Sequence, residues 1–194
     1  MMLRDFRNWN IFLNELIKDD YPSPPDKGHT ALMRGIMTEW ISGLKGVTNV
    51  LDVGCGDAAI AEGFFKHLGM EYTGISNGMD VEKLTALGKN VINGDFSFLE
   101  EFADASFGLI FSRHSLEHSP SPLLTLMEWH RVSANFLCLV LPNPAYWGRV
   151  GQGHYSVLEE DQWNFLLKRS GWNVIWRKNT DQEFWFMCEK AKRY

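Results

Sequence analysis

The feature that most constrains the fold is a regular alternation of short apolar runs with helical patterns over residues 49–142. The apolar runs have the length of strands, and between them apolar residues recur at helical spacing. This order is typical of a parallel sheet covered by helices on both faces, because each parallel strand needs a long crossover. The expected strands are Asn49–Val53, Glu71–Ile75, Lys89–Gly94, Gly108–Ser112 and Phe136–Leu141, and the expected helices are Ala58–Leu68, Val81–Gly88 and Pro122–Val132.

The C-terminal part of the chain departs from this alternation. Leu158–Ser170 has a helical pattern, and Trp172–Trp176 and Glu183–Cys188 then predict two strands joined by the short polar link K-N-T-D. Two successive strands without a helix between them indicate an antiparallel pair. We therefore expect a terminal antiparallel hairpin at one edge of a doubly wound sheet, with the ligand outside the carboxyl ends of the strands.

The N-terminal part is divided by the prolines of Tyr21–Gly28, which block a regular helix. Before them, Phe6–Ile17 has the apolar spacing of an amphipathic helix, and after them Ala31–Leu44 predicts another helix. A length of 194 residues is close to that of one domain. We expect a single domain, with residues 1–28 as an arm or lid and residues 29–194 as its body.

Composition and charge exclude several classes of protein. Apolar residues make up 45% and charged residues 22%, as in ordinary globular domains. No run approaches the ~18 apolar residues that a membrane span requires, and no apolar signal core follows the N-terminus, so we expect a cytoplasmic location. The formal net charge of −5 argues against a nucleic-acid partner, and we expect the basic residues near the C-terminus to form a solvated face.

The three cysteines, Cys55, Cys138 and Cys188, are widely spaced. Their odd number and the absence of a C-x-x-C pair predict reduced thiols, and we expect no metal site because no ligand spacing indicates one.

The run N-V-L-D-V-G-C-G-D-A-A, residues 49–59, joins a strand to a glycine turn and a helix. Gly54 and Gly56 let the backbone turn tightly and approach a ligand without a Cβ in the way. Asp52, two residues before the first glycine, makes the pattern more specific. The same run also fits the dinucleotide pattern G-x-G-x-x-A, which we favour less because Asp52 would stand near a pyrophosphate.

Asp52, Gly54 and Gly56 resemble the first motif of the class I S-adenosylmethionine-dependent methyltransferases. The resemblance implies a Rossmann-like, mostly parallel seven-stranded sheet with a reversed terminal strand. It implies S-adenosylmethionine as cofactor, S-adenosylhomocysteine as product, and a turn of Gly54, Cys55 and Gly56 around the methionine part of the cofactor. The body of the domain would then be catalytic.

The next two strand ends extend this resemblance. The family's ribose-binding acid aligns with Ser76, whose single hydroxyl cannot make a bidentate contact, and Asn77 and Asp80 are the alternatives. The resemblance implies that Asp95 accepts a hydrogen bond from the adenine amino group and that Phe96 flanks the ring.

The segment Ala105–Ser119 resembles a subgroup in which a leucine-glutamate-histidine run follows the fourth strand, and Glu128–Val132 resembles that subgroup's next helix. The resemblance places Ser112–His114 beside the sulfonium and gives His118 a bracing role.

Leu141–Tyr155, rich in proline, glycine and aromatic residues, follows the fifth expected strand and is our predicted acceptor loop. Methyl transfer from a sulfonium is possible without a base, because alignment of an activated electrophile supplies much of the rate. If the acceptor must lose a proton, a histidine can take it. The candidates for that base are His114, His118 and His154, and those for contact with the acceptor are His114, Tyr146, Trp147, His154 and Tyr155.

The resemblance therefore predicts a methyltransferase that acts on a small-molecule acceptor, without a membrane or nucleic-acid partner. Two alternatives stay open. The first is a noncatalytic member of the fold that binds nucleosides or partners, which Ser76 suggests. The second is an RNA-modifying methyltransferase, against which the acidic charge counts.

Overall fold

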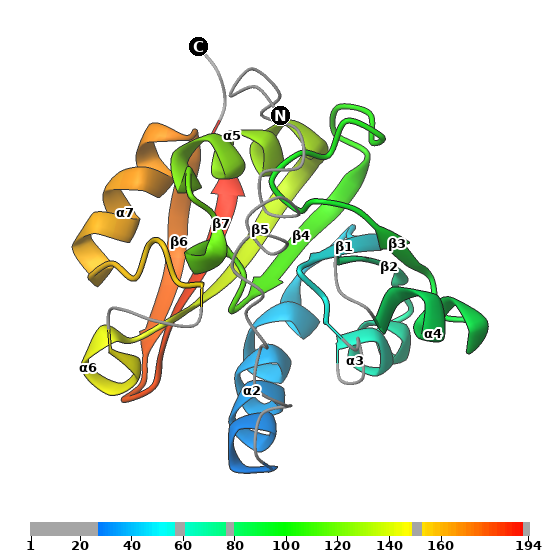
Figure 1. Ribbon diagram of the computed structural model, residues 1–194, viewed down its shortest axis with the longest axis horizontal. Coiled ribbons are helices and arrows are strands. Elements are labelled where there is room, and N and C mark those ends of the chain that lie inside the picture. The colour runs from blue at the N-terminus through cyan, green and yellow to red at the C-terminus, as the bar shows by residue number, and fades with distance from the viewer. Residues whose placement is uncertain (1–26, 57–60, 77–79, 149–152, 192–194) are drawn as a thin grey trace.

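The computed structural model describes residues 27–56, 61–76, 80–148 and 153–191. Within them, seven strands form one sheet in the order β3-β2-β1-β4-β5-β7-β6 (Figure 1). Strands β1 to β5 run parallel to one another, whereas β7 runs antiparallel to both β5 and β6. The strands are β1 (Asn49–Val53), β2 (Glu71–Ser76), β3 (Val91–Asn93), β4 (Phe107–Arg113), β5 (Ser133–Pro142), β6 (Trp172–Asn179) and β7 (Glu183–Lys190).

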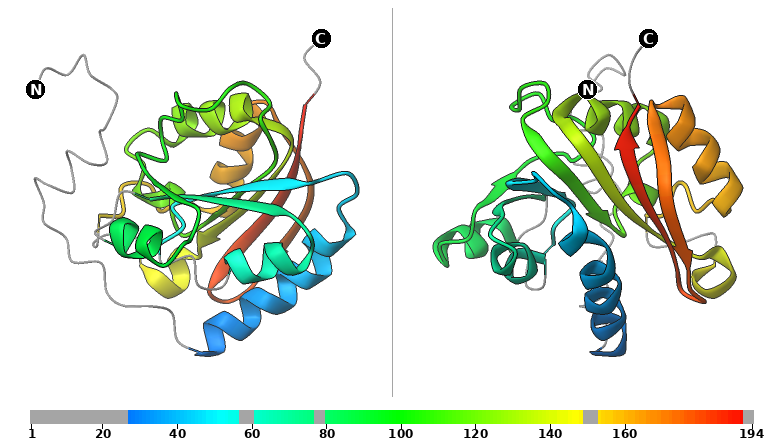
Figure 2. Two further views of the ribbon diagram at one scale, coloured as in Figure 1. Left: turned by 90° about the vertical axis from the view of Figure 1, so that its right-hand side faces the viewer. Right: turned by 180° about the vertical axis from the view of Figure 1, so that it is seen from behind.

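Helices cover both faces of this sheet (Figure 2). Helices α2 and α3 pack against one face, where Ile36, Phe65 and Val50 share a hydrophobic core. Helices α5 and α7 pack against the other face, where Trp129 and Trp163 belong to a second core. The helices are α2 (Lys27–Trp40), α3 (Ala61–His67), α4 (Asp80–Ala86), α5 (Pro122–Val132), α6 (Pro144–Trp147) and α7 (Glu160–Arg169), with 3-10 turns η1 (Ile41–Gly43) and η2 (Leu116–His118).

The helix ends follow local chemistry. Pro122 begins α5, where its fixed φ suits the first helical turn and its missing N–H costs nothing. Helix α7 begins with a capping box, in which the Glu159 side chain and the Gln162 side chain satisfy each other's backbone N–H groups. Asn143 caps α6 by accepting from the Ala145 N–H at 3.0 Å.

The predicted fold class is confirmed: the sheet is mostly parallel, has seven strands and ends in the expected antiparallel hairpin. Some bounds differ. Strand β6 continues to Asn179, so two residues of the expected polar link belong to the edge strand, whose outer side tolerates polar residues. Helix α2 begins at Lys27, inside the segment expected to separate the arm from the body. The expected helix at Phe6–Ile17 lies outside the described residues.

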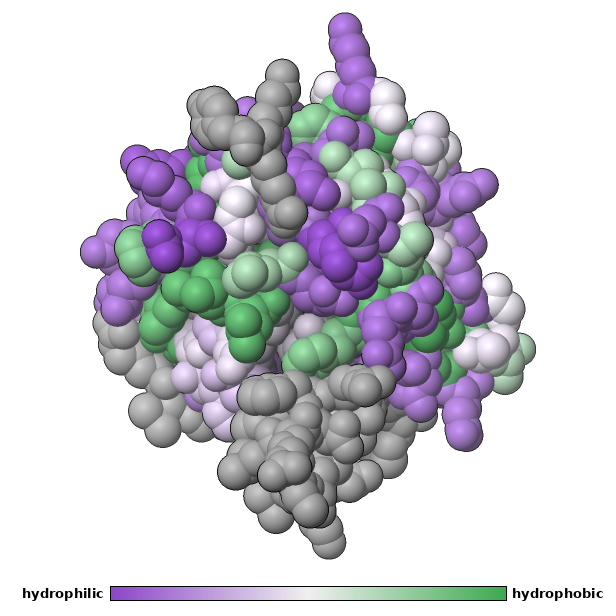
Figure 3. Space-filling view, turned by 90° about the horizontal axis from the view of Figure 1, so that it is seen from above, coloured by the Kyte–Doolittle hydropathy of each residue, from purple (hydrophilic) through white to green (hydrophobic). Residues whose placement is uncertain are grey.

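None of the helices in the described part of the chain combines the length and the apolar character that crossing a bilayer requires. Among the described residues on the face seen in Figure 3, hydrophobic groups of residues are interspersed with hydrophilic ones.

Candidate functional site

The sheet order brings four sequence-predicted residues to one edge. Strands β3, β2, β1 and β4 are parallel neighbours, so their carboxyl ends lie side by side. Asp52 and Ser112 lie near the ends of β1 and β4, Ser76 ends β2, and Asp95 follows β3. The edge of an open parallel sheet beyond the carboxyl ends of its strands is where ligands bind in such folds.

The glycine turn after β1 has the left-handed conformation that glycine permits, with φ of +74° at Gly54 and +53° at Gly56. The N–H groups of Gly54 and Cys55 both donate to the Ile75 carbonyl, at 2.9 and 3.1 Å, which fixes the turn against β2.

The two glycines have different surroundings. A Cβ at Gly54 would stand 2.1 Å from the Ser115 Oγ, so this glycine lets the loop after β4 pack closely. At Gly56, no atom of the described residues other than its chain neighbours lies within 4 Å of that position. The backbone of Gly56 is therefore open to a ligand, whereas the space over Gly54 is filled by Ser115.

Asp52 is a buried carboxyl rather than an exposed one, with 3% of its surface accessible. The Tyr72 hydroxyl donates to its Oδ2 at 2.7 Å. Burial raises the pKa of Asp52 to about 7, against the opposing effects of the Tyr72 hydrogen bond and the positive charge of Arg113. Asp52 thus lies just before the glycine turn and is hydrogen-bonded to Tyr72 of the neighbouring strand β2.

The second and third strand ends are held by their own hydrogen bonds. The half-buried Ser76 accepts from the Gly94 N–H through its carbonyl at 3.0 Å. Asp95 is buried, and its Oδ1 accepts from the Ser97 N–H at 2.8 Å. Asp95 therefore shapes the turn in which it stands.

Phe96 packs against Trp129 of α5, with ring centroids 6.3 Å apart, and its carbonyl accepts from the Trp129 Nε1 at 2.7 Å. Its side chain is buried in the core. The roles toward adenine expected of Asp95 and Phe96 stay predictions.

Ser112 is a buried hydroxyl at the end of β4. Its side chain is fully covered, and in the described part of the chain its Oγ has no hydrogen-bond partner. A buried polar atom without a partner costs free energy, which points to a missing partner at this edge. Of the other predicted cofactor contacts, Cys55 is partly buried in the turn, and Asn77 lies outside the described residues.

A buried ion network beside this edge has no counterpart in the sequence-based predictions. Glu183, fully buried at the start of β7, accepts from Arg113 Nη2 at 2.9 Å and from Trp185 Nε1 at 2.9 Å. His114 Nε2 lies 2.8 Å from the same Glu183 Oε1. His114 has a φ of +52°, an uncommon conformation for a residue with a side chain, and the network holds it there.

The expected acceptor loop contributes aromatic surface. Trp147 and Tyr146, on α6, lie with ring centroids 5.1 Å apart and are 43% and 57% exposed. The His114 ring lies edge-on to Trp147 at 5.8 Å, so the end of β4 and the acceptor loop are in contact. Tyr155 is also exposed, at 42%.

The structure also brings together three side chains that could bind a metal ion, although His154 is remote from the other two in the sequence. This differs from the sequence-based expectation that the chain has no set of metal ligands. Glu117, His118 and His154 each offer a ligand atom, and these atoms lie within 4.8 Å of one another. The rings of His118 and His154 are 4.7 Å apart. Two of the three candidate bases are therefore neighbours.

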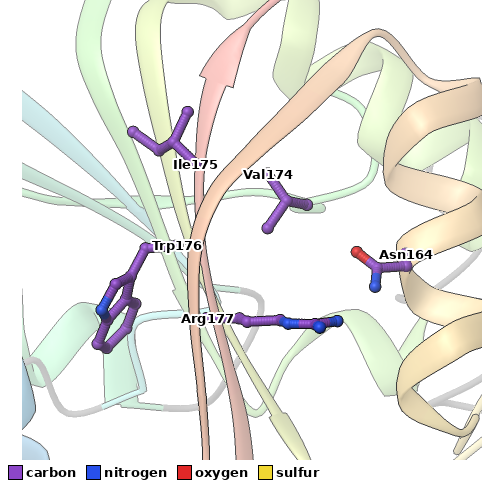
Figure 4. A pocket seen from close by; sticks show the side chains of 5 residues that line it. All are labelled: Asn164, Val174, Ile175, Trp176 and Arg177. Atoms are coloured by element: carbon purple, nitrogen blue, oxygen red, sulfur yellow. The ribbon is translucent and has the colours of Figure 1, made fainter.

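A hollow elsewhere on the molecule is a poor candidate for the site. It lies between α7 and the middle of the edge strand β6, and it is lined by Asn164, Val174, Ile175, Trp176 and Arg177 (Figure 4). Arg177 is already paired with Glu160 at 3.1 Å. Because its lining residues belong to α7 and β6, the hollow lies along an edge strand and not beyond the carboxyl ends of the parallel strands.

Comparison with solved structures identifies the fold. An S-adenosylmethionine-dependent methyltransferase from Archaeoglobus fulgidus has a TM-score of 0.67 at 16% identity, covering 94% of this chain and 100% of that one. One from Aquifex aeolicus has a TM-score of 0.65 at 19% identity, covering 87% and 100%. A Pyrococcus horikoshii protein has a TM-score of 0.71 at 14% identity, covering 86% and 92%.

A search of curated proteins by sequence gives no match. The family model described as a methyltransferase domain matches residues 51–135, from β1 to the start of β5. This stretch contains the glycine turn, the ends of β2, β3 and β4, and η2. Residues 51–135 are therefore similar to the methyltransferase-domain family, and the chain has the fold of these S-adenosylmethionine-dependent methyltransferases.

Proposed function

We propose that this chain transfers a methyl group from S-adenosylmethionine to a small-molecule acceptor at the carboxyl edge of the parallel strands. The observation that carries the proposal is the glycine turn after β1, which is left-handed and open at Gly56 beside the ends of β2, β3 and β4. Gly56 itself presents no Cβ to a ligand that approaches its backbone.

The residues at this edge fit the cofactor. The open backbone at Gly56 suits the methionine part, and Ser112 supplies a buried hydroxyl that has no partner in the described residues. Ser76 offers one hydroxyl where a carboxylate would bind both ribose hydroxyls, so we expect weaker binding than such a carboxylate would give. When bound, the cofactor supplies a methyl group that is already activated for displacement.

The chain itself then has to orient the acceptor and exclude water. The half-exposed rings of Tyr146 and Trp147 offer a face to a planar acceptor. His114 touches Trp147 and is held by Glu183, so its ring is fixed between the end of β4 and this aromatic surface. This position suits a group that orients the acceptor or takes its proton.

A calorimetric titration with S-adenosylmethionine and S-adenosylhomocysteine tests the proposal, with NADH as the competing ligand class. We expect saturable binding of both S-adenosylmethionine and S-adenosylhomocysteine and none of NADH. Gly56→Ala should weaken binding about tenfold or more, because a Cβ would enter the open space over a backbone with positive φ.

Gly69→Ala is the matched control. Gly69 also has a positive φ, at +75°, and a Cβ there would likewise meet no described atom within 4 Å beyond the chain neighbours. This glycine lies between α3 and the start of β2, at the opposite end of the strand from the carboxyl ends. Both variants carry similar backbone strain, so a difference in their cofactor affinities would report a contact between the cofactor and the glycine turn. Equal affinities for the two variants would contradict the proposal. Cofactor binding without turnover over a broad acceptor panel would favour the noncatalytic alternative.

A further inference from the structure

The cluster of Glu117, His118 and His154 lies outside the groups assigned to the cofactor. Glu117 and His118 belong to η2 after β4, and His154 belongs to the segment that follows β5 and α6. Their ligand atoms come within 4.8 Å of one another, and rotation of the side chains would bring all three to the ~2.0–2.2 Å bond lengths of a single ion.

Glu117 points to a missing cation. Its side chain is fully buried, and neither carboxylate oxygen has a hydrogen-bond partner among the described residues. His114 Nδ1 stands 3.5 Å from its Oε1. A carboxyl buried in this way is costly unless a proton or a cation compensates it.

The two histidines are arranged as neutral ligands. His118 Nδ1 donates to the Gly153 carbonyl at 3.2 Å, so a neutral ring carries its lone pair on Nε2. A hydrogen bond of this kind from the second ring nitrogen is the usual support of a metal-binding histidine. Burial lowers the pKa of both His118 and His154, because the charged form of each ring is poorly solvated.

The segment that carries His154 is fixed to η2 by backbone contacts. The N–H groups of Tyr155 and Ser156 both donate to the Glu117 carbonyl, at 2.8 and 3.0 Å. The Ser156 hydroxyl donates to the Ser119 carbonyl at 3.3 Å. The three side chains are therefore held together by contacts of the chain itself, as in a preformed site.

We propose that Glu117, His118 and His154 bind one divalent first-row transition metal ion, with Zn²⁺ as its probe. Two imidazoles and one carboxylate are a ligand set that Zn²⁺ and Fe²⁺ take in proteins. Mg²⁺ prefers oxygen ligands and several waters, so the two imidazoles disfavour it. Three protein ligands leave a coordination position open.

The position of the metal site suggests which group would occupy the open coordination position. Ser115, two residues before Glu117, packs against the glycine turn, and its Oγ lies 3.4 Å from the Gly54 carbonyl. The metal would thus stand between the cofactor turn and the acceptor loop, where it would bind an oxygen of a hydroxyl-bearing acceptor. This assignment of the acceptor class rests on the proposed function, whereas the metal site does not.

The test is a Zn²⁺ titration of the tag-free, chelator-treated full chain by calorimetry, without cofactor, and with Mg²⁺ in a parallel titration. We expect one Zn²⁺ per chain and no comparable Mg²⁺ binding. His154→Ala should weaken Zn²⁺ binding about tenfold or more, since it removes one of three ligands. His67→Ala is the matched control, because His67 is exposed at the end of α3, and it should bind Zn²⁺ like the wild type.

Glu117→Gln provides a second variant that keeps the side-chain volume if His154→Ala fails to fold, as checked by circular dichroism. Wild-type protein without saturable Zn²⁺ binding, or undiminished binding by the folded ligand variants, would overturn the site. Because no cofactor is present, this result is independent of methyl transfer. A chain that binds Zn²⁺ but not S-adenosylmethionine would keep the metal site and refute the proposed function.

Discussion

At the scale of single residues, Asp52 makes the stability of the protein depend on pH. Burial raises the pKa of its carboxyl from 3.8 to about 7 in the folded chain. Between these values the folded state holds a proton that the unfolded state has released, so the free energy of unfolding falls as pH rises. The stabilisation is present below pH 4 and is lost through pH 7.

We predict that Asp52→Asn removes this dependence. The amide has no proton to lose and keeps an oxygen that can accept from the Tyr72 hydroxyl. Urea unfolding at pH values from 4.5 to 7.5 should show wild-type stability falling relative to the variant, by at most about 4 kcal/mol.

Asp181→Asn controls for the loss of one acidic group, because Asp181 is exposed in the turn between β6 and β7. It should leave the pH profile close to that of the wild type. Parallel profiles for wild type and Asp52→Asn would show that the Asp52 carboxyl titrates alike in the folded and unfolded chains.

At the scale of elements, Glu183 joins the ends of strands that lie far apart in the chain. Its carboxylate, at the start of β7, accepts two hydrogen bonds from Arg113 at the end of β4, at 3.1 and 2.9 Å. Both side chains are largely buried, with accessible fractions of 0% for Glu183 and 12% for Arg113. Removal of one member of a buried ion pair leaves the other charge without compensation.

We therefore predict that Glu183→Gln destabilises the fold by about 3 kcal/mol, as measured by urea unfolding at pH 7. Glu189→Gln makes the same chemical change on the same strand, where Glu189 is exposed and accepts from the exposed Asn173 at 2.8 Å. That variant should change stability by no more than about 0.5 kcal/mol. Similar losses for both would contradict a special contribution from the buried network.

The elements differ in how far the sequence determines them. Helix α5 has the predicted bounds, because Pro122 marks its start and its apolar spacing is regular. Strand β6 extends beyond its prediction, because an edge strand needs no apolar residues on its solvent side.

The site could be predicted only where its residues are neighbours in the chain. The glycine turn is one continuous run, so its pattern is visible in the sequence. Arg113 and Glu183 are 70 residues apart, and His154 is remote from Glu117, so their proximity depends on strand order and on the path of the loop after β5. No local spacing signals such pairs.

At the scale of the whole molecule, the charge distribution bears on the partners. The chain has 19 lysines and arginines against 24 acidic residues. Several basic side chains near the C-terminus are already engaged within the molecule. Arg177 pairs with Glu160 at 3.1 Å, Lys178 with Glu39 at 2.9 Å, and Lys190 donates to the Ser133 carbonyl at 2.6 Å. The sequence predicts a solvated basic face, and the structure adds that these three basic side chains have partners within the molecule.

We accordingly predict that the chain binds RNA no more tightly than a Kd of about 10⁻⁴ M at physiological salt, the weak end of nonspecific association. Fluorescence anisotropy with a labelled single-stranded RNA, at low and physiological salt, measures this. Glu39→Lys with Glu160→Lys is an informative comparison, because it frees Arg177 and Lys178 and adds positive charge beside them. That variant should gain salt-sensitive binding that the wild type lacks. A wild-type affinity in the micromolar range, weakening steeply with salt, would instead favour the RNA-modifying alternative, since release of counterions from neutralised phosphates produces that dependence.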